Sequence, residues 1–217
     1  AAGDAGSADA QADARQHPGF PASSPHVWAC GGTTLLATRT RILSETVWNE
    51  LARGQGAAGS GVSGLFAPPA YQLRAGIHPR SADSGRVGRG LPDASGVADP
   101  VTGWNVLALG RLRTTGGTSA VAPMYTALWT LVGALRGGRI GMPHPALYAT
   151  RRPAFNDIRK GDTGGPYSAA RGWDAASGWG SPNGRAIAQV LGVHGPALRV
   201  QRGRVIGRST PRELELT

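Results

Sequence analysis

One serine in this 217-residue chain has the setting that acyl transfer requires. Ser119 stands in the sequence GGTSAVAP, residues 116–123, where two glycines make a tight turn and an apolar stretch begins. A hydroxyl on such a turn is exposed, faces the positive end of a helix dipole and lies near backbone N–H groups that can hold an oxyanion. The alternative is that Thr118 or Ser119 only caps the helix, since both residue types are preferred there. This segment alone leaves both interpretations open.

Three aspartates elsewhere in the chain are candidates for a functional role. Asp4 lies in AGDAGS, residues 2–7, where an aspartate is most often a turn residue. Asp157 and Asp174 both follow the serine, and a glycine-rich turn before Asp174 can aim backbone carbonyls inward. Carboxylates and carbonyls are the hard oxygen ligands that Ca²⁺ prefers, so this pair indicates a calcium site. The alternative is two unrelated aspartates on the surface.

Five motifs with a fixed order and spacing carry the next inference. They are AGDAGS at residues 2–7, SSPHVWACGGT at 23–33, GLPDASGVADP at 90–100, GGTSAVAP at 116–123, and the set NDI, GWD and GWGSP within 156–182. Over residues 1–192 the chain therefore resembles the sedolisin family of serine-carboxyl peptidases, and within it the kumamolisin-like bacterial members. A single GTSA-type motif is weak, whereas the ordered set is specific.

The resemblance implies a role for each matching residue. Ser119 is expected to be the acyl-forming nucleophile and Asp4 the oxyanion-hole residue. A carboxyl group donates a hydrogen bond to an oxyanion only when protonated, so the resemblance implies activity at acidic pH. One Ca²⁺ is implied as cofactor, with the carboxylates of two residues and the carbonyls of three as ligands: Asp157, Asp174, Ile158, Ala170 and Gly172.

A serine nucleophile also needs a base, which in this family is a Glu and an Asp four residues apart on a helix before the oxyanion aspartate. The sequence contains no Glu-x-x-x-Asp: Asn49 follows Glu45 at that spacing, and Gly54 follows Glu50. Asp9 and Asp13 have the spacing, but they come after the oxyanion motif. We therefore expect the C-terminal portion of a catalytic domain that is inactive alone.

Two alternatives to an active acid peptidase remain. One is a non-catalytic remnant that keeps calcium and peptide binding. The other is a neutral subtilisin-type protease with a histidine base and an asparagine in the oxyanion hole, which Asp4 disfavours. Asp93 and Asp99 are interpreted as turn residues bonded to backbone groups, and no role is assigned to His144.

Composition limits the partners. The formal net charge is +10, yet the 22 Arg and single Lys are scattered and form no basic run interleaved with aromatic residues. We expect a protein or peptide substrate, a monomer, and neither nucleic acid nor a membrane, since no window approaches 18 continuous apolar residues. The resemblance implies secretion. The single Cys30 excludes an internal disulfide.

The elements that must position these residues indicate an α/β fold: a subtilisin-like parallel sheet flanked by helices, incomplete at its N-terminal side. A helix buried on most faces is predicted over 120–135, and a second over 182–191 with Ser181 as N-cap. Residues 26–36 are predicted as two strands around a Gly31-Gly32 turn, 106–112 as a strand or hairpin arm, and 53–64 and 75–100 as loops. Residues 1–192 are assigned to the peptidase domain and 193–217 to a loose, Arg-rich tail.

Overall fold

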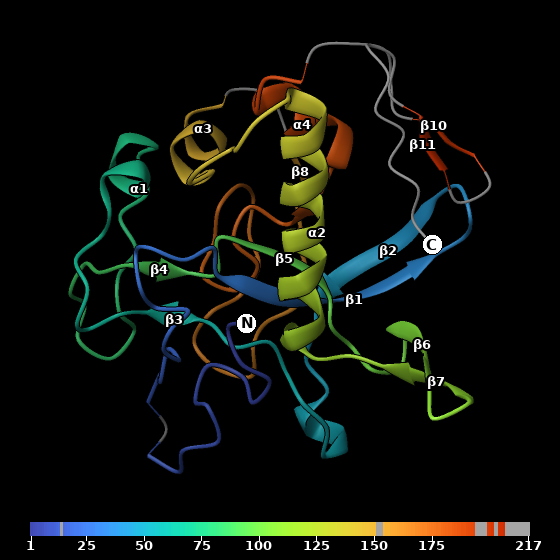
Figure 1. Ribbon diagram of the computed structural model, residues 1–217. Coiled ribbons are helices and arrows are strands. Elements are labelled where there is room, and N and C mark those ends of the chain that lie inside the picture. Colours follow the sequence, from blue (N-terminus) through green and yellow to red (C-terminus); the bar gives the residue numbers. More distant parts are fainter. Residues whose placement is uncertain (14, 151–153, 194–198, 202–203, 207–217) are drawn as a thin grey trace.

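A three-stranded sheet with one long helix across it forms the centre of the computed structural model (Figure 1). The structure describes residues 1–13, 15–150, 154–193, 199–201 and 204–206. The elements are β1 (Cys30–Ala37), β2 (Ile42–Val47), η1 (Leu51–Arg53), β3 (Gly61–Val62), α1 (Ala70–Arg74), β4 (Gly90–Leu91), β5 (Ala94–Val97), β6 (Trp104–Ala108), β7 (Arg111–Thr115), α2 (Thr118–Arg136), α3 (His144–Ala149), β8 (Phe155–Asn156), β9 (Ser181–Pro182), α4 (Gly184–Val190), β10 (Arg199–Gln201) and β11 (Arg204–Ile206).

The central sheet has the order β2-β1-β5 and is mixed. β1 runs parallel to β5, with Cys30 opposite Ala94, and antiparallel to β2, with Thr33 opposite Val47. The predicted parallel sheet is therefore correct for one of these two pairings. The prediction of a loop over 75–100 is wrong where β4 and β5 form.

The predicted turn at Gly31-Gly32 is also wrong, because both glycines lie inside β1. A Cβ atom on Gly31 would lie 2.5 Å from the Ser95 hydroxyl, and one on Gly32 would lie 2.7 Å from the Ala98 Cβ. These glycines allow close packing in a sheet, which a sequence does not distinguish from a turn.

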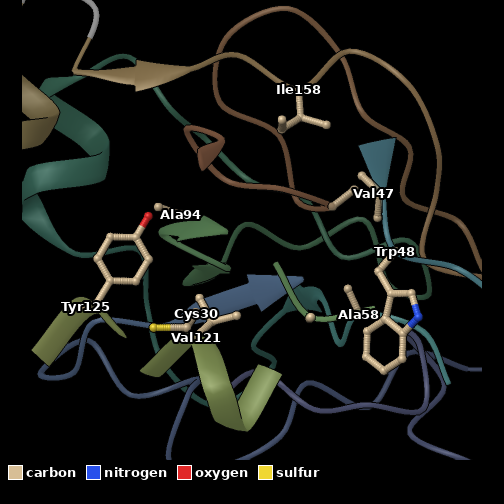
Figure 2. Close-up of a cluster of buried hydrophobic side chains, with 10 residues drawn as sticks. Cys30, Val47, Trp48, Ala58, Ala94, Val121, Tyr125 and Ile158 are labelled. Carbon is tan, nitrogen blue, oxygen red and sulfur yellow. The ribbon is translucent and has the colours of Figure 1, made fainter. Parts of the chain in front are cut away.

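Helix α2 forms as predicted, but it is buried on one face only. Its buried side chains are Thr118, Val121, Tyr125 and Val132. Val121 and Tyr125 join the core cluster over the sheet, where Figure 2 shows them beside Cys30 and Ala94. By length and composition alone α2 could also cross a membrane, because its mean hydropathy is 1.2 over 18 residues. The expectation that the chain has no segment of this length and hydropathy is therefore not met. Core helices of soluble proteins share this property.

The remaining predicted elements differ in their boundaries. The single strand predicted over 106–112 is wrong, because the chain reverses at Leu109 and Gly110 and this range contributes to both arms of the antiparallel hairpin β6–β7. Ser181 is not an N-cap, because Ser181 and Pro182 form β9 beside β8. The N-cap of α4 is Asn183, whose side-chain oxygen accepts the Ala186 N–H at 3.1 Å. In the predicted tail, β10 and β11 form an antiparallel pair, and most of its other residues lie outside the described ones.

Candidate active site

The segment that carries Asp4 is fixed by backbone hydrogen bonds to residues 57–59. The Ala57 N–H donates to the Asp4 carbonyl at 3.0 Å, and the Gly59 N–H donates to the Gly3 carbonyl at 2.8 Å. A Cβ on Gly59 would lie only 2.1 Å from the Ala2 carbonyl oxygen. The close approach that places Asp4 therefore requires glycine at position 59.

The turn before Ser119 is fixed in the same way, against the end of β5. Gly117 has a φ of +95°, and its N–H donates to the Ala98 carbonyl at 2.5 Å. A Cβ on Gly116 would lie 2.2 Å from that same carbonyl oxygen. Both glycines of the motif are thus required by their positions, one for close packing and one for its left-handed backbone.

Asp4 and the serine turn, 114 residues apart in sequence, are in direct contact. The Asp4 Oδ1 atom accepts the Thr118 backbone N–H and the Thr118 hydroxyl, each at 2.7 Å. The other oxygen, Oδ2, lies beside Gly117, 2.6 Å from where a Cβ of that residue would stand. The structure therefore brings together the two residues assigned to catalysis, Ser119 and Asp4, at the N-terminus of α2.

Ser119 itself is not a capping residue. Gly117 is the N-cap and makes no side-chain cap, and the Thr118 hydroxyl bonds to Asp4 and Gly3. The Ser119 side chain is exposed and has no hydrogen-bond partner in the part of the chain that the structure describes. An unpartnered hydroxyl at the positive end of a helix is suited to nucleophilic attack, not to holding the helix end.

Among the described residues, no carboxylate other than that of Asp4 hydrogen-bonds to residues 116–119. The Glu45 carboxylate accepts the hydroxyls of Thr33 at 2.8 Å and Ser181 at 2.7 Å, which ties the sheet to β9. Asp13 pairs with His17 at the surface at 2.9 Å. Among the described carboxylates, only that of Asp4 therefore lies against the Ser119 turn.

The two predicted calcium-binding carboxylates both bond to one loop, residues 170–174. The Asp157 Oδ1 atom accepts the Gly172 N–H at 3.0 Å, and the Asp174 Oδ2 atom accepts the Ala170 N–H at 2.8 Å. Ile158 is buried in the core cluster, which fixes the backbone beside Asp157. All five predicted ligand positions thus belong to one connected region.

The oxygen atoms around Asp157 and Asp174 match only in part the ligands that a hard cation such as Ca²⁺ prefers. No group of three or more His, Cys, Asp or Glu side chains is found in the described residues, so Ca²⁺ would depend on backbone carbonyls here. Burial raises the pKa of Asp174, as expected for a carboxylate without a neighbouring cation. Asp157 already has a cation, because the Arg159 Nε atom donates to its Oδ2 at 2.7 Å.

Sequence reasoning missed a buried ionic cluster around Asp93. The Arg89 and Asp93 side chains are both 0% exposed and 2.7 Å apart. The Asp93 carboxylate also accepts the Tyr148 hydroxyl at 2.6 Å and the Ala29 N–H at 2.7 Å, with His144 Nε2 at 3.2 Å. Burial raises the pKa of Asp93, but Arg89 and the neighbouring donors outweigh it and lower the pKa overall. Asp93 is therefore more than a turn residue, and its partners are too scattered in sequence to predict the cluster.

Three proteins illustrate the relatives of this chain, and no family model matches it. Kumamolisin of Bacillus sp. strain MN-32 is 43% identical over 196 residues, which is 88% of this chain and 35% of kumamolisin. Sedolisin of Pseudomonas sp. strain 101 is 37% identical over 75% of this chain and 28% of sedolisin. Tripeptidyl-peptidase 1 of Canis lupus familiaris is 30% identical over 88% of this chain and 36% of that protein. The chain thus spans about a third of the length of these relatives.

A solved structure shares the fold. Pseudomonas sedolisin, a serine-carboxyl proteinase complexed with two molecules of pseudo-iodotyrostatin, matches with a TM-score of 0.73 and 33% identity. The match covers 87% of this chain and 53% of the sedolisin chain. It confirms the predicted α/β class.

Proposed function

Because this chain belongs to the sedolisin family, we propose that it carries the nucleophile and the oxyanion-binding residue of a serine-carboxyl endopeptidase that cleaves proteins at acidic pH. The observation that supports this most directly is the contact between the Asp4 carboxylate and the turn before Ser119. It supports a role in which a protonated Asp4 donates a hydrogen bond near the hydroxyl of Ser119.

The hydrogen bonds around Asp4 support separate roles for its two oxygens. Since Oδ1 already accepts two hydrogen bonds, a proton on the carboxyl group belongs on Oδ2. When the Ser119 oxygen attacks a peptide carbonyl, negative charge develops on the substrate oxygen, and the Oδ2–H group stabilises it. An ionised Asp4 would repel that charge, so the proposed reaction needs acidic conditions.

The proton of Ser119 needs an acceptor, and the residues that the structure describes do not supply one. We propose that the chain alone cleaves peptides too slowly to be useful, since loss of a triad partner removes several orders of magnitude in rate. The missing base also supports the second candidate, a non-catalytic remnant that binds peptide. A neutral subtilisin-type protease is less supported, because His144 is buried on Asp93 and His17 pairs with Asp13.

A chimera tests the proposal. The part of the kumamolisin catalytic domain that precedes the matched residues, joined in frame before Ala1, should give peptide hydrolysis at acidic pH. That activity should fall by several orders of magnitude in Ser119→Ala, with folding checked by circular dichroism. Activity that survives Ser119→Ala, or that peaks at neutral pH, would contradict the proposed chemistry. Acid proteolysis by the unmodified chain that is lost in Ser119→Ala would contradict its proposed inactivity.

We also propose that the loop at residues 170–174 binds one Ca²⁺ with Asp157, Asp174 and the carbonyls of Ile158, Ala170 and Gly172. The ion would supply positive charge between two carboxylates that otherwise hold the loop through single N–H groups. Because Arg159 occupies an oxygen of Asp157, Ca²⁺ binding would have to displace its guanidinium.

Thermal unfolding measures this site without any activity. Ca²⁺ at 100 times its Kd should stabilise the chain by about 2.7 kcal/mol, which raises Tm by roughly 5–10 °C. Asp157→Asn should abolish the shift and Arg159→Ala should enlarge it at limiting Ca²⁺, whereas Asp13→Asn at the surface should leave it intact. An equal shift in Asp157→Asn would exclude this loop as the site.

For partners, we propose protein or peptide substrates, a monomer and an extracellular location, the last from family resemblance only. A nucleic-acid surface is not supported, because several arginines are already paired: Arg53 with Glu50, Arg89 with Asp93 and Arg159 with Asp157. The positive charge is therefore partly neutralised within the fold.

A further inference from the structure

The β6–β7 hairpin exposes both of its faces. Every residue of both strands is exposed, and the strands pair from Trp104 opposite Thr115 to Ala108 opposite Arg111. The Trp104 Nε1 atom donates to the Val97 carbonyl at 2.8 Å, which anchors the base of the hairpin to β5. A two-stranded ribbon with no packed face is at most marginally stable in water. Packing within the described chain therefore does not account for the apolar side chains farther out.

Leucines gather on one face of this hairpin and at its tip. Leu107 and Leu112 stand opposite each other and so share a face, and they are 73% and 69% exposed. Leu109 is 98% exposed and forms the two-residue turn with Gly110, with φ of +51° and +72°. Asn-Gly is the usual sequence at such a turn. A fully exposed leucine in a left-handed conformation serves neither the turn nor the core, so its apolar character needs another explanation.

Unpaired arginines accompany these leucines. Arg111 and Arg113 lie on the other face, opposite Ala108 and Val106. Neither arginine makes an ion pair with any residue that the structure describes. Residues 101–115 contain no Asp or Glu. The hairpin therefore combines exposed aliphatic side chains with positive charge that the fold does not neutralise.

The turn between β1 and β2 repeats this composition. Residues 36–44 are all exposed and include no acidic residue. Three large aliphatic side chains and two arginines without an ion pair among the described residues stand there: Leu36, Ile42, Leu43, Arg39 and Arg41. The two hairpins adjoin, because the Leu35 N–H donates to the Thr102 hydroxyl at 3.3 Å. Both extend to the right of α2 in Figure 1.

Charge and shape together favour one kind of partner. The unpaired arginines require an anionic partner, which disfavours a second copy of this equally basic surface. Nucleic acid is bound by aromatic side chains that stack on bases, whereas the side chains at these two tips are aliphatic. An anionic bilayer offers both phosphate groups for the arginines and an apolar layer for the leucines. We infer that the β6–β7 hairpin, together with the β1–β2 turn, docks on the surface of a bilayer that contains anionic lipid.

This inference does not depend on the proposed peptidase function, since neither hairpin supplies a catalytic residue. Peripheral binding also needs no spanning segment. The inference therefore replaces the sequence-based expectation that a membrane is not a partner. Bound in this way, the molecule would be held at the membrane surface by its hairpins and not by α2.

Flotation with vesicles tests the surface. The chain should float with vesicles of equal parts phosphatidylglycerol and phosphatidylcholine, and far less with phosphatidylcholine alone. Leu109→Asn should weaken binding at least about tenfold, because it removes the inserted side chain. The same change places the preferred residue in the turn, so the hairpin is kept. Arg111→Gln should weaken binding about fivefold, the effect of one cation near an anionic surface.

Two matched variants serve as controls. Leu65 is 84% exposed in the loop after β3, and Leu65→Asn should leave flotation unchanged. Arg74 is exposed at the end of α1 and has no ion pair among the described residues, so Arg74→Gln should also have no effect. Circular dichroism checks that each variant keeps its helices.

Several results would overturn the inference. Equal flotation with neutral vesicles would contradict recognition of anionic lipid. Undiminished flotation of Leu109→Asn, or an equal loss in Leu65→Asn, would place the contact elsewhere on the molecule. Flotation that disappears when the preceding part of the kumamolisin catalytic domain is joined before Ala1 would assign the hairpins to an interface within that domain. Binding to single-stranded DNA or polyglutamate without flotation would assign the surface to an acidic polymer.

Discussion

Thr118 connects the two halves of the candidate catalytic site. Its backbone N–H and its hydroxyl both reach the Asp4 Oδ1 atom, while the same hydroxyl contacts Gly3. The residue before Ser119 therefore orients Asp4, and the Ser119 hydroxyl has no partner among the described residues. A helix N-terminus normally uses such a hydroxyl as a cap, and here it holds Asp4 instead.

We predict that Thr118→Val lowers the free energy of unfolding by about 1 kcal/mol, because it preserves the shape of the side chain but removes the hydrogen bonds of a buried hydroxyl to Gly3 and to the exposed Asp4 carboxylate. The corresponding drop in Tm, roughly 2–4 °C, can be measured by differential scanning calorimetry. Thr114→Val removes a hydroxyl bond to Asn105 in the exposed hairpin and is the control, with an expected effect below about 0.5 kcal/mol. Equal effects of the two variants would contradict a specific role for Thr118.

At the scale of elements, β1 depends on two adjacent glycines, a pattern that in the sequence also indicates a turn. Gly32 has no side chain, which allows Ala98 and Trp48 to approach its backbone closely, between the sheet and the loop before η1. This contact joins three segments that are distant in sequence. A turn and a close sheet contact both require glycine, so only the tertiary partners distinguish them.

Gly32→Ala should therefore destabilise the fold by about 1–3 kcal/mol, because the new Cβ would lie 2.7 Å from Ala98 and 3.2 Å from Trp48. Urea denaturation with an unchanged m-value would measure the effect as a lower midpoint. Gly138→Ala, where no atom lies within 4 Å of the added Cβ, should change stability by less than about 0.5 kcal/mol. A neutral Gly32→Ala would show that the close packing is not needed.

The difference between local patterns and contacts distant in sequence explains which parts of the molecule can be predicted from the sequence. The serine turn and α2 follow local rules of glycine and apolar periodicity, so their existence is predictable, whereas the turn at Leu109 and Gly110 between β6 and β7 was missed. β5 and the Arg89–Asp93 cluster depend on partners far away in sequence, and the start of α4 was set by Asn183 instead of Ser181. The contact between Asp4 and Ser119's turn was expected only through resemblance, since nothing local links two positions 114 residues apart.

At the scale of the whole molecule, the Arg89–Asp93 cluster links four segments through one buried charge pair. Asp93 bonds to Ala29 before β1, to Arg89 before β4, and to His144 and Tyr148 on α3. Removing one partner of a buried ion pair usually destabilises the fold by much more than the intact pair stabilises it. The cluster is therefore expected to control global stability.

Asp93→Asn should lower the free energy of unfolding by about 3–5 kcal/mol near pH 6, because Arg89 would remain buried without its counter-charge. The pKa of Asp93 is lowered in the folded state, so its ionised form stabilises the fold above the unfolded pKa of about 3.9. This stabilisation is lost as the pH falls through the lower, folded value. Urea denaturation at pH 6, 4 and 3 should therefore show the difference between wild type and variant shrinking with acidity. A difference that grew below pH 4 would contradict this assignment.

The reactivity of the single cysteine can be used to measure how often the folded molecule opens. Cys30 begins β1 beneath α2, and burial raises the pKa of its thiol to about 12, so in the native state it offers almost no thiolate to an alkylating reagent. Labelling at pH 8 should then proceed only through unfolding, at a rate set by the opening equilibrium. Mass spectrometry would record the rate of alkylation. One sulfur atom thus reports, without enzyme activity, how often the segment around β1 opens to solvent.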